Sequence, residues 1–156
     1  MKFIPLRRQW AIRDEIVKVG HWGVKETERI HYGQIRPIPV HLPPFHLPLT
    51  TDCSGWIDLC FMWGGARDPL GMDYSGFGST YNLIKHGWHV ELDAALPGDV
   101  IVYGPTPGHH AVLVIEKGVD PTVISHGQEK GPIVLKHSVE QKYQPKPARA
   151  FRYRLR

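Results

Sequence analysis

Cys53 is the residue of this sequence best placed to do chemistry, because it stands at the predicted start of an apolar helix that ends at Gly64-Gly65. At such a position, unpaired backbone N–H groups and the positive end of the helix dipole favour a thiolate over a thiol. The same N–H groups can stabilise the oxyanion that forms when a thiolate attacks a carbonyl group. If a histidine lies within reach in the fold, this pattern indicates a cysteine hydrolase.

Three of the ten histidines stand at the ends of predicted strands. His109 and His110 open one apolar run, and His126 closes the next. If the two strands are antiparallel neighbours, His110 and His126 lie at the same edge of the sheet. His110 would then move protons for Cys53, and His126 would hold the His110 ring in the right tautomer. Because neighbouring residues of a strand point to opposite faces, only one of His109 and His110 can face Cys53.

The remaining candidates have simpler interpretations. Cys60 follows Cys53 by seven residues, which is about 10 Å along a helix and beyond the ~7 Å between Cα atoms that a disulfide allows. We therefore expect two free thiols, with Cys60 as a small buried hydrophobe. Asp52 is predicted to be the N-cap of the helix. A zinc site built from the three histidines is not expected, because the doubled histidines point to opposite faces. The chemistry requires no cofactor.

Length and charge limit the alternatives further. A chain of 156 residues suits one domain over residues 1–156. No apolar run reaches the ~18 residues of a membrane span, and the start has no apolar region typical of a cleaved signal peptide. The net charge is +4, and part of the excess lies in Arg152, Arg154 and Arg156, which alternate with apolar residues. That pattern favours the solvated face of a last strand; the alternative is attraction to a polyanion, either a nucleic acid or an anionic wall polymer.

The order of predicted elements indicates an α+β fold with helices packed on an antiparallel sheet of about five strands. Five prolines within residues 37–49 exclude a helix or a central strand there and predict a stiff, extended loop. Periodicity and turn residues predict helices over 8–19 (stopped by Gly20), 24–30, 53–63 and 80–85, and strands over 100–103, 111–115, 122–125, 133–136 and 150–155.

Several blocks of the sequence resemble the NlpC-type cell-wall peptidases, which are papain-like cysteine endopeptidases that cut peptidoglycan stem peptides. The resemblance covers roughly residues 8–136, and the blocks that carry it are Ile30-His31-Tyr32-Gly33, Thr51-Asp52-Cys53-Ser54-Gly55, Leu96-Pro97-Gly98-Asp99-Val100, His110-Ala111-Val112-Leu113-Val114-Ile115 and Ser125-His126-Gly127.

The resemblance implies a papain-like fold whose N-terminal helices include the nucleophile helix. It implies a triad of Cys53, His110 and His126, and it favours His110 over His109 because the strand then has the family's length. Tyr32, Asp52 and Ser54 are implied to bind substrate. The implied partner is bacterial peptidoglycan rather than nucleic acid, and the implied bond joins γ-linked D-glutamate to a diamino acid.

The sequence departs from the family's pattern in two ways. The family's usual Tyr-x-Trp-Gly-Gly directly before the nucleophile is absent, and the loop 37–49 separates Tyr32 from Cys53. Stand-alone, leaderless versions with such loops look most like phage lysins or tail-associated peptidases. That implies phage tail or lysis proteins as partners, and a location in the host cytoplasm before release or on the virion, with action at the cell wall. A peptidoglycan amidase or acyltransferase, and a non-catalytic module of a phage tail, are the alternatives.

Overall fold

The computed structural model describes residues 6–127 and 131–156. No helix in these residues is long and apolar enough to cross a membrane. The elements follow one another in the order α1 (Leu6–Lys25), η1 (Thr27–Arg29), β1 (Ile30–Tyr32), β2 (Leu49–Thr51), α2 (Cys53–Trp63), α3 (Thr80–His86), β3 (Trp88–Val90), η2 (Leu92–Ala94), β4 (Val100–Tyr103), β5 (His110–Glu116), β6 (Thr122–Ser125), β7 (Ile133–Lys136), α4 (His137–Gln141) and β8 (Ala148–Arg152).

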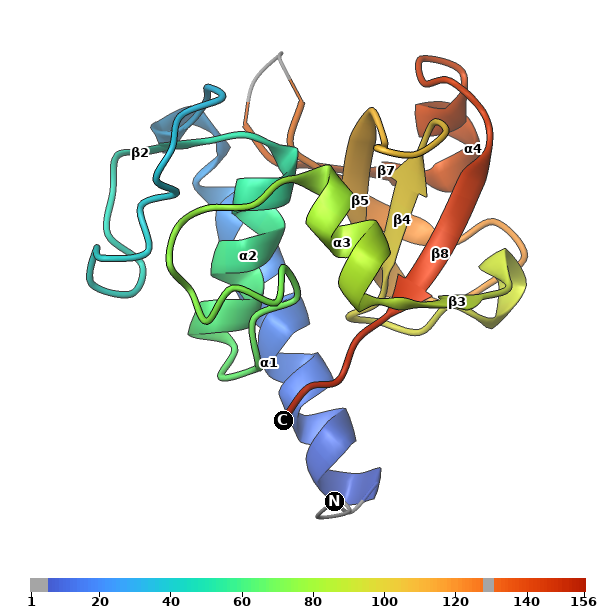
Figure 1. Ribbon diagram of the computed structural model, residues 1–156, viewed down its shortest axis with the longest axis horizontal. Helices are drawn as coiled ribbons and strands as arrows, with labels where there is room; N and C mark the ends of the chain where they lie inside the picture. The colour runs from blue at the N-terminus through green and yellow to red at the C-terminus, as the bar shows by residue number, and fades with distance from the viewer. Residues whose placement is uncertain (1–5, 128–130) are drawn as a thin grey trace.

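A six-stranded antiparallel sheet in the order β3-β8-β4-β5-β6-β7 forms one side of the molecule, and α1 and α2 pack beside it (Figure 1). β1 and β2 form a separate two-stranded parallel sheet. The predicted α+β architecture is therefore confirmed. The main sheet has one strand more than expected, because the short, largely exposed β3 pairs with β8 and has no apolar pattern of its own.

Alternate residues of the central strands reach two different apolar layers. Ala111 and Leu113 of β5 belong to the layer that contains the side chains of α1 and α2. Val112 belongs to the layer on the opposite face of the sheet, together with Tyr103 of β4. A residue's place in this alternation therefore decides whether its side chain faces the helices or the far side.

The first helix is longer than the sequence predicts. α1 runs without a break through Gly20 and Gly23, where the sequence indicates a stop and then a second helix. A Cβ atom on Gly20 would lie 2.9 Å from Cδ1 of Ile124, and one on Gly23 would collide with Cζ2 of Trp56. The two glycines therefore allow α1 to approach the sheet and α2 closely, and they do not end the helix.

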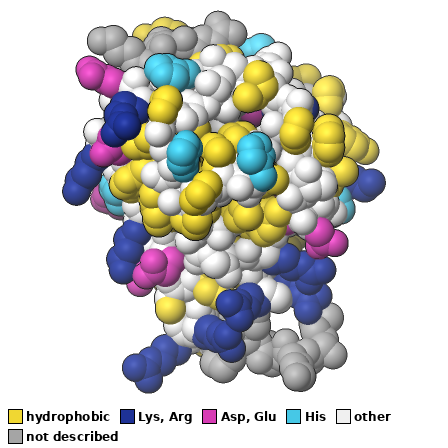
Figure 2. All heavy atoms as spheres, turned by 90° about the vertical axis from the view of Figure 1, so that its left-hand side faces the viewer, with side chains coloured by type: hydrophobic (Ala, Val, Ile, Leu, Met, Phe, Trp, Pro, Cys, Tyr) yellow, Lys and Arg dark blue, Asp and Glu magenta, His cyan; other side chains and the backbone are white. Residues whose placement is uncertain are grey.

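The proline-rich segment 37–49 forms no helix, as predicted, and only its last residue belongs to a strand. Phe45 anchors the segment, since its ring centroid lies 4.9 Å from that of Trp22 in α1 and 5.4 Å from that of Trp63 in α2. Figure 2 shows hydrophobic and histidine side chains gathered on this side of the molecule. The loop is thus packed against both helices just before the chain enters β2 and Cys53.

Asp99 connects three parts of the fold, which are α1, β8 and the turn before β4. Its carboxylate is fully buried and accepts hydrogen bonds from Arg13 of α1 at 2.9 Å and from Arg152 of β8 at 2.9 Å. It also accepts a hydrogen bond from the backbone N–H of Leu96 at 2.8 Å. The Pro-Gly-Asp block therefore supplies a buried counter-charge, and Arg152 is largely neutralised rather than part of an open basic face.

Candidate active site

Cys53 is the first residue of α2, where the sequence places it. Asp52 caps this helix, because its Oδ1 accepts a hydrogen bond from the N–H of Gly55 at 2.8 Å. The first backbone bond of the helix runs from the N–H of Trp56 to the carbonyl of Asp52, at 2.9 Å. The N–H groups of Cys53 and Ser54 precede that bond, so they are positioned as donors for an oxyanion beside the sulfur.

His110 begins β5, and its imidazole interacts with the side chain of Cys53, which raises the pKa of the ring. The His110 residue is 6% exposed, and its Nε2 lies 2.9 Å from Oγ of Ser125 and 3.2 Å from Oε1 of Glu140. Because Nε2 faces these two oxygens, Nδ1 is the ring nitrogen that remains for the thiol. The ring also stacks on Tyr103 of β4, with centroids 6.3 Å apart. The imidazole is thus fixed from several sides.

The charges of His110 and Glu140 stabilise each other. Burial lowers the pKa of His110, but the hydrogen bonds and charges of Cys53 and Glu140 outweigh burial and raise it to about 9. Burial raises the pKa of Glu140, but its hydrogen bond and ion pair with His110 outweigh that effect, and the net shift is downward. Both directions favour an imidazolium–carboxylate pair at neutral pH.

His126 lies at the same end of the sheet as His110 but does not orient it, which corrects the expectation from the sequence. β5 and β6 are antiparallel with Leu113 opposite Ile124, so His126 shares the helix-side face with Ile124. His110 lies on the other face. The Nε2 of His126 instead donates to the carbonyl oxygen of Thr51 at 2.8 Å and approaches that of His31 at 3.2 Å. His126 therefore ties β1 and β2 to the sheet.

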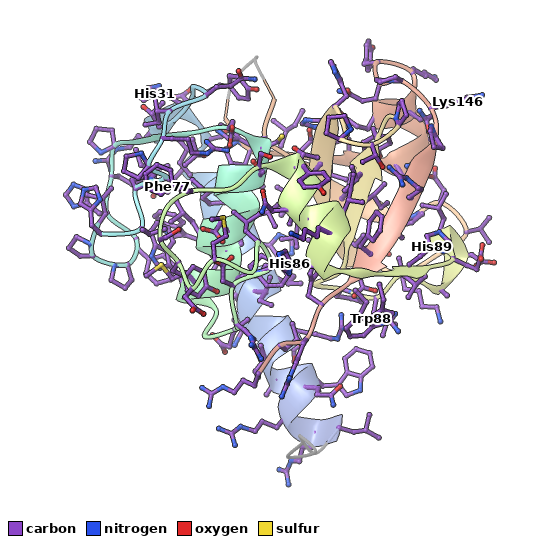
Figure 3. The ribbon with its side chains drawn as sticks, viewed as in Figure 1. His31, Phe77, His86, Trp88, His89 and Lys146 are labelled. Carbon is purple, nitrogen blue, oxygen red and sulfur yellow. The ribbon has the colours of Figure 1, made fainter. Side chains whose placement is uncertain are left out.

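His109 is exposed and lines the cleft described below, whereas His110 is buried. Figure 3 shows His31, His86 and His89 on separate parts of the molecule. Within residues 6–127 and 131–156, no group of three or more histidine, cysteine, aspartate or glutamate side chains is arranged to hold a metal ion.

An open cleft crosses the site and has two parts. The part beside Cys53, of about 390 Å³, is called the Arg36 side, and the part beside His110, of about 600 Å³, is called the Glu140 side. Three residues line both parts, which are Tyr32, Gln34 and His109. The sulfur and the imidazole therefore meet where the two parts adjoin, and an extended chain can lie across them.

Tyr32, Asp52 and Ser54, which the sequence suggests for substrate binding, all line the Arg36 side. Asp52 and Ser54 already have partners, because Nη2 of Arg36 lies 3.0 Å from Oδ2 of Asp52 and 3.2 Å from Oγ of Ser54. Tyr32 receives only a long hydrogen bond from Gln34, at 3.5 Å. Of the three, the Tyr32 hydroxyl is the most accessible to a ligand.

Sequence reasoning missed Arg36, Ser125 and Glu140. Ser125 lies inside the block Ser125-His126-Gly127, but the family resemblance implies a role for the histidine of that block and not for the serine. Glu140 belongs to α4, a five-residue helix that has no apolar periodicity to reveal it. No local pattern connects that helix with His110, thirty residues earlier in the chain.

No protein-family model matches this chain, and no curated protein matches its sequence. Solved structures do resemble it. The NlpC/p60 domain of the peptidoglycan hydrolase SagA has a TM-score of 0.61 and 15% identity, over 90% of this chain and 97% of that one. An NlpC/p60 family protein from Bacillus cereus ATCC 10987 has a TM-score of 0.59 and 15% identity, over 90% of this chain but only 40% of its own length. The chain thus has the papain-like NlpC/p60 fold.

Proposed function

We propose that this chain is a peptidoglycan hydrolase, a cysteine endopeptidase that cleaves bonds in the stem peptides. The observation that carries the proposal is the contact between Cys53, at the start of a helix, and the buried His110, at the junction of a two-part cleft. The chemistry follows from this contact, and the likeness to the SagA hydrolase domain supports the choice of peptidoglycan as substrate.

The reaction transfers the acyl group first to the Cys53 sulfur and then from the sulfur to water. Transfer of the Cys53 thiol proton to Nδ1 of His110 gives the imidazolium that pairs with Glu140, and the resulting thiolate attacks the carbonyl carbon of the scissile amide. The carbonyl electron pair moves onto oxygen, where the N–H groups of Cys53 and Ser54 stabilise it. When the intermediate collapses, the C–N bond breaks and His110 returns its proton to the leaving amine. Water then attacks the thioester, His110 takes a proton from the water, and that proton returns to the sulfur as the acid leaves.

The proposed point of cleavage is the bond that joins γ-linked D-glutamate to a diamino acid. The resemblance of the Cys53 and His110 blocks to the NlpC-type peptidases supports this choice. Digestion of several purified peptidoglycans, with fragment masses measured for the parent and for Cys53→Ala, tests this. The expected products are glycans that keep a shortened stem. Release of whole stem peptides would instead indicate an amidase. Peptidoglycan that stays uncut with both the parent and Cys53→Ala would indicate a non-catalytic structural module.

The loop 37–49 supports a narrower proposal, a phage lysin or tail-associated peptidase that acts at the host wall. Expression in a bacterial host, with and without a protein that permeabilises the inner membrane, tests the lysin. Lysis is expected only with permeabilisation and only when Cys53 is intact. Growth that continues after permeabilisation would contradict the lysin role.

A further inference from the structure

Glu140 occupies the place at His110 that the sequence suggests for His126. The carboxylate comes from α4, on the far side of the sheet from α2, and its side chain is 9% exposed. Oε1 lies 3.2 Å from Nε2 of His110 and accepts a hydrogen bond from Nε2 of Gln144 at 2.9 Å. Ser125 also interacts with Glu140, an interaction that helps to lower the pKa of the carboxyl group, and its Oγ lies 2.9 Å from Nε2 of His110.

These contacts fit one arrangement of hydrogen atoms. Nε2–H of His110 donates toward Oγ of Ser125 and Oε1 of Glu140, and the Ser125 hydroxyl donates to Glu140. Such a proton on Nε2 leaves the lone pair of neutral His110 on Nδ1, the side of the ring that Cys53 faces. A carboxylate in this place also stabilises the imidazolium that forms when Nδ1 takes the thiol proton.

We propose that Glu140 is the positioning residue for His110, holding the imidazole in the tautomer that faces Cys53 and stabilising its charged form. This inference rests on the proposed function. Glu140 does not take the proton itself; it acts only through the ring of His110. His126 has a separate role, because it joins the strand before Cys53 to the main sheet.

Among the residues that the structure describes, the titratable groups that face the His110 ring come from three elements. Cys53 faces the ring from α2, Glu140 from α4 and the Tyr103 ring from β4. The hydroxyl of Tyr103 is hydrogen-bonded to Nδ1 of His137 at 2.8 Å, so that second imidazole does not reach His110 directly. Glu140 is therefore the group whose charge can be removed with the least change to the rest.

The test is the rate of Cys53 alkylation by iodoacetamide from pH 5 to pH 10, which requires no substrate. The fully buried Cys60 should not react, and a Cys53→Ala protein gives the background. Glu140→Gln keeps the size and an acceptor oxygen but removes the charge. We expect Glu140→Gln to lower the rate of Cys53 alkylation at pH 6 by about tenfold. Loss of the ion pair with Glu140 should lower the pKa of His110 by about one unit or more, which makes the imidazolium beside the thiolate less stable. Glu140→Asp should recover part of that loss.

The matched control is His126→Gln, which should lower stability but leave the shape of the alkylation profile unchanged. NMR titration of the His110 ring in the parent protein needs no variant, and it should show protonation persisting well above the ordinary range for histidine. A Glu140→Gln profile that coincides with the parent profile, or a His110 that titrates at or below its ordinary value, overturns the inference. A parent Cys53 that does not react at any pH overturns both this inference and the proposed function.

Discussion

Nη2 of Arg36 lies 3.0 Å from Oδ2 of Asp52, so a guanidinium covers the carboxylate that caps the nucleophile helix. The same side chain donates through Nε to the carbonyl oxygen of Gly78 at 2.8 Å. Arg36 therefore connects the segment after β1, the cap of α2 and the glycine-rich loop before α3. All three segments contribute residues to the Arg36 side of the cleft.

Arg36→Gln is expected to lower the rate of peptidoglycan hydrolysis by about tenfold or more, because Asp52 loses a charge-assisted partner and the cleft wall loses its connection. Initial rates of amino-group release measure this. Arg36→Lys is the matched control, since a lysine keeps the charge but cannot reach Asp52, Ser54 and Gly78 together. Full activity in Arg36→Lys would contradict the explanation, because charge alone would then be sufficient.

Asp99→Asn is expected to reduce the free energy of unfolding by about 3–5 kcal/mol, because it leaves the buried Arg13 without its counter-charge. Urea unfolding of the parent and the variant measures the difference. Glu15→Gln is the control, since the pair of Glu15 with Lys18 is exposed and should change stability by no more than about 0.5 kcal/mol. Equal effects of the two substitutions would contradict the role assigned to Asp99.

Asp58, buried in α2, should make stability depend on pH. Burial raises its pKa to about 9, and the neighbouring Asp68 adds to the shift. The folded state therefore keeps a proton that the unfolded state releases above about pH 4, and stability from this group falls as pH rises from about 4 to about 9.

Asp58→Asn removes this titration and keeps a donor toward Asp68. Its stability relative to the parent should rise with pH, reaching a gain on the order of a few kcal/mol near pH 7. Urea unfolding at pH 4, 6 and 8 measures the trend. A difference between the two proteins that stays constant over this range would show that Asp58 is ionised in the folded state.

Gly23→Ala tests the contact between α1 and α2. An alanine inside a helix is normally more stable than a glycine by about 1 kcal/mol, but a Cβ here would meet the Trp56 ring. We expect a loss of about 1–3 kcal/mol in the free energy of unfolding, the usual cost of overpacking. A second substitution, Trp56→Leu, should reduce that loss. A stabilised Gly23→Ala protein would mean that the two helices separate easily.

The sequence predicts the fold class well because its signals are local. The apolar run after Cys53, the turn at Pro97-Gly98 and the apolar strands each depend on neighbours in the chain. The exceptions are positions where tertiary contacts determine whether a helix ends or continues. Gly20 looks like a stop, but close packing against Ile124 keeps it inside α1.

The site is predictable only where sequence position fixes geometry. The place of Cys53 at a helix start follows from Asp52 and the apolar run behind it. The orienting group at His110 does not follow, because it depends on sheet faces and on a helix thirty residues away. Strand alternation applied to both β5 and β6 would have separated His126 from His110, but no local signal indicates Glu140.

The central claim is that Cys53 is the nucleophile that cuts stem peptides, and it is tested most directly by counting new amino termini. Purified peptidoglycan is incubated with the parent, Cys53→Ala and Cys60→Ala, and the released amino groups are labelled and measured over time. We expect steady release by the parent and by folded Cys60→Ala, and none by Cys53→Ala. Release by Cys53→Ala at the parent rate would contradict it.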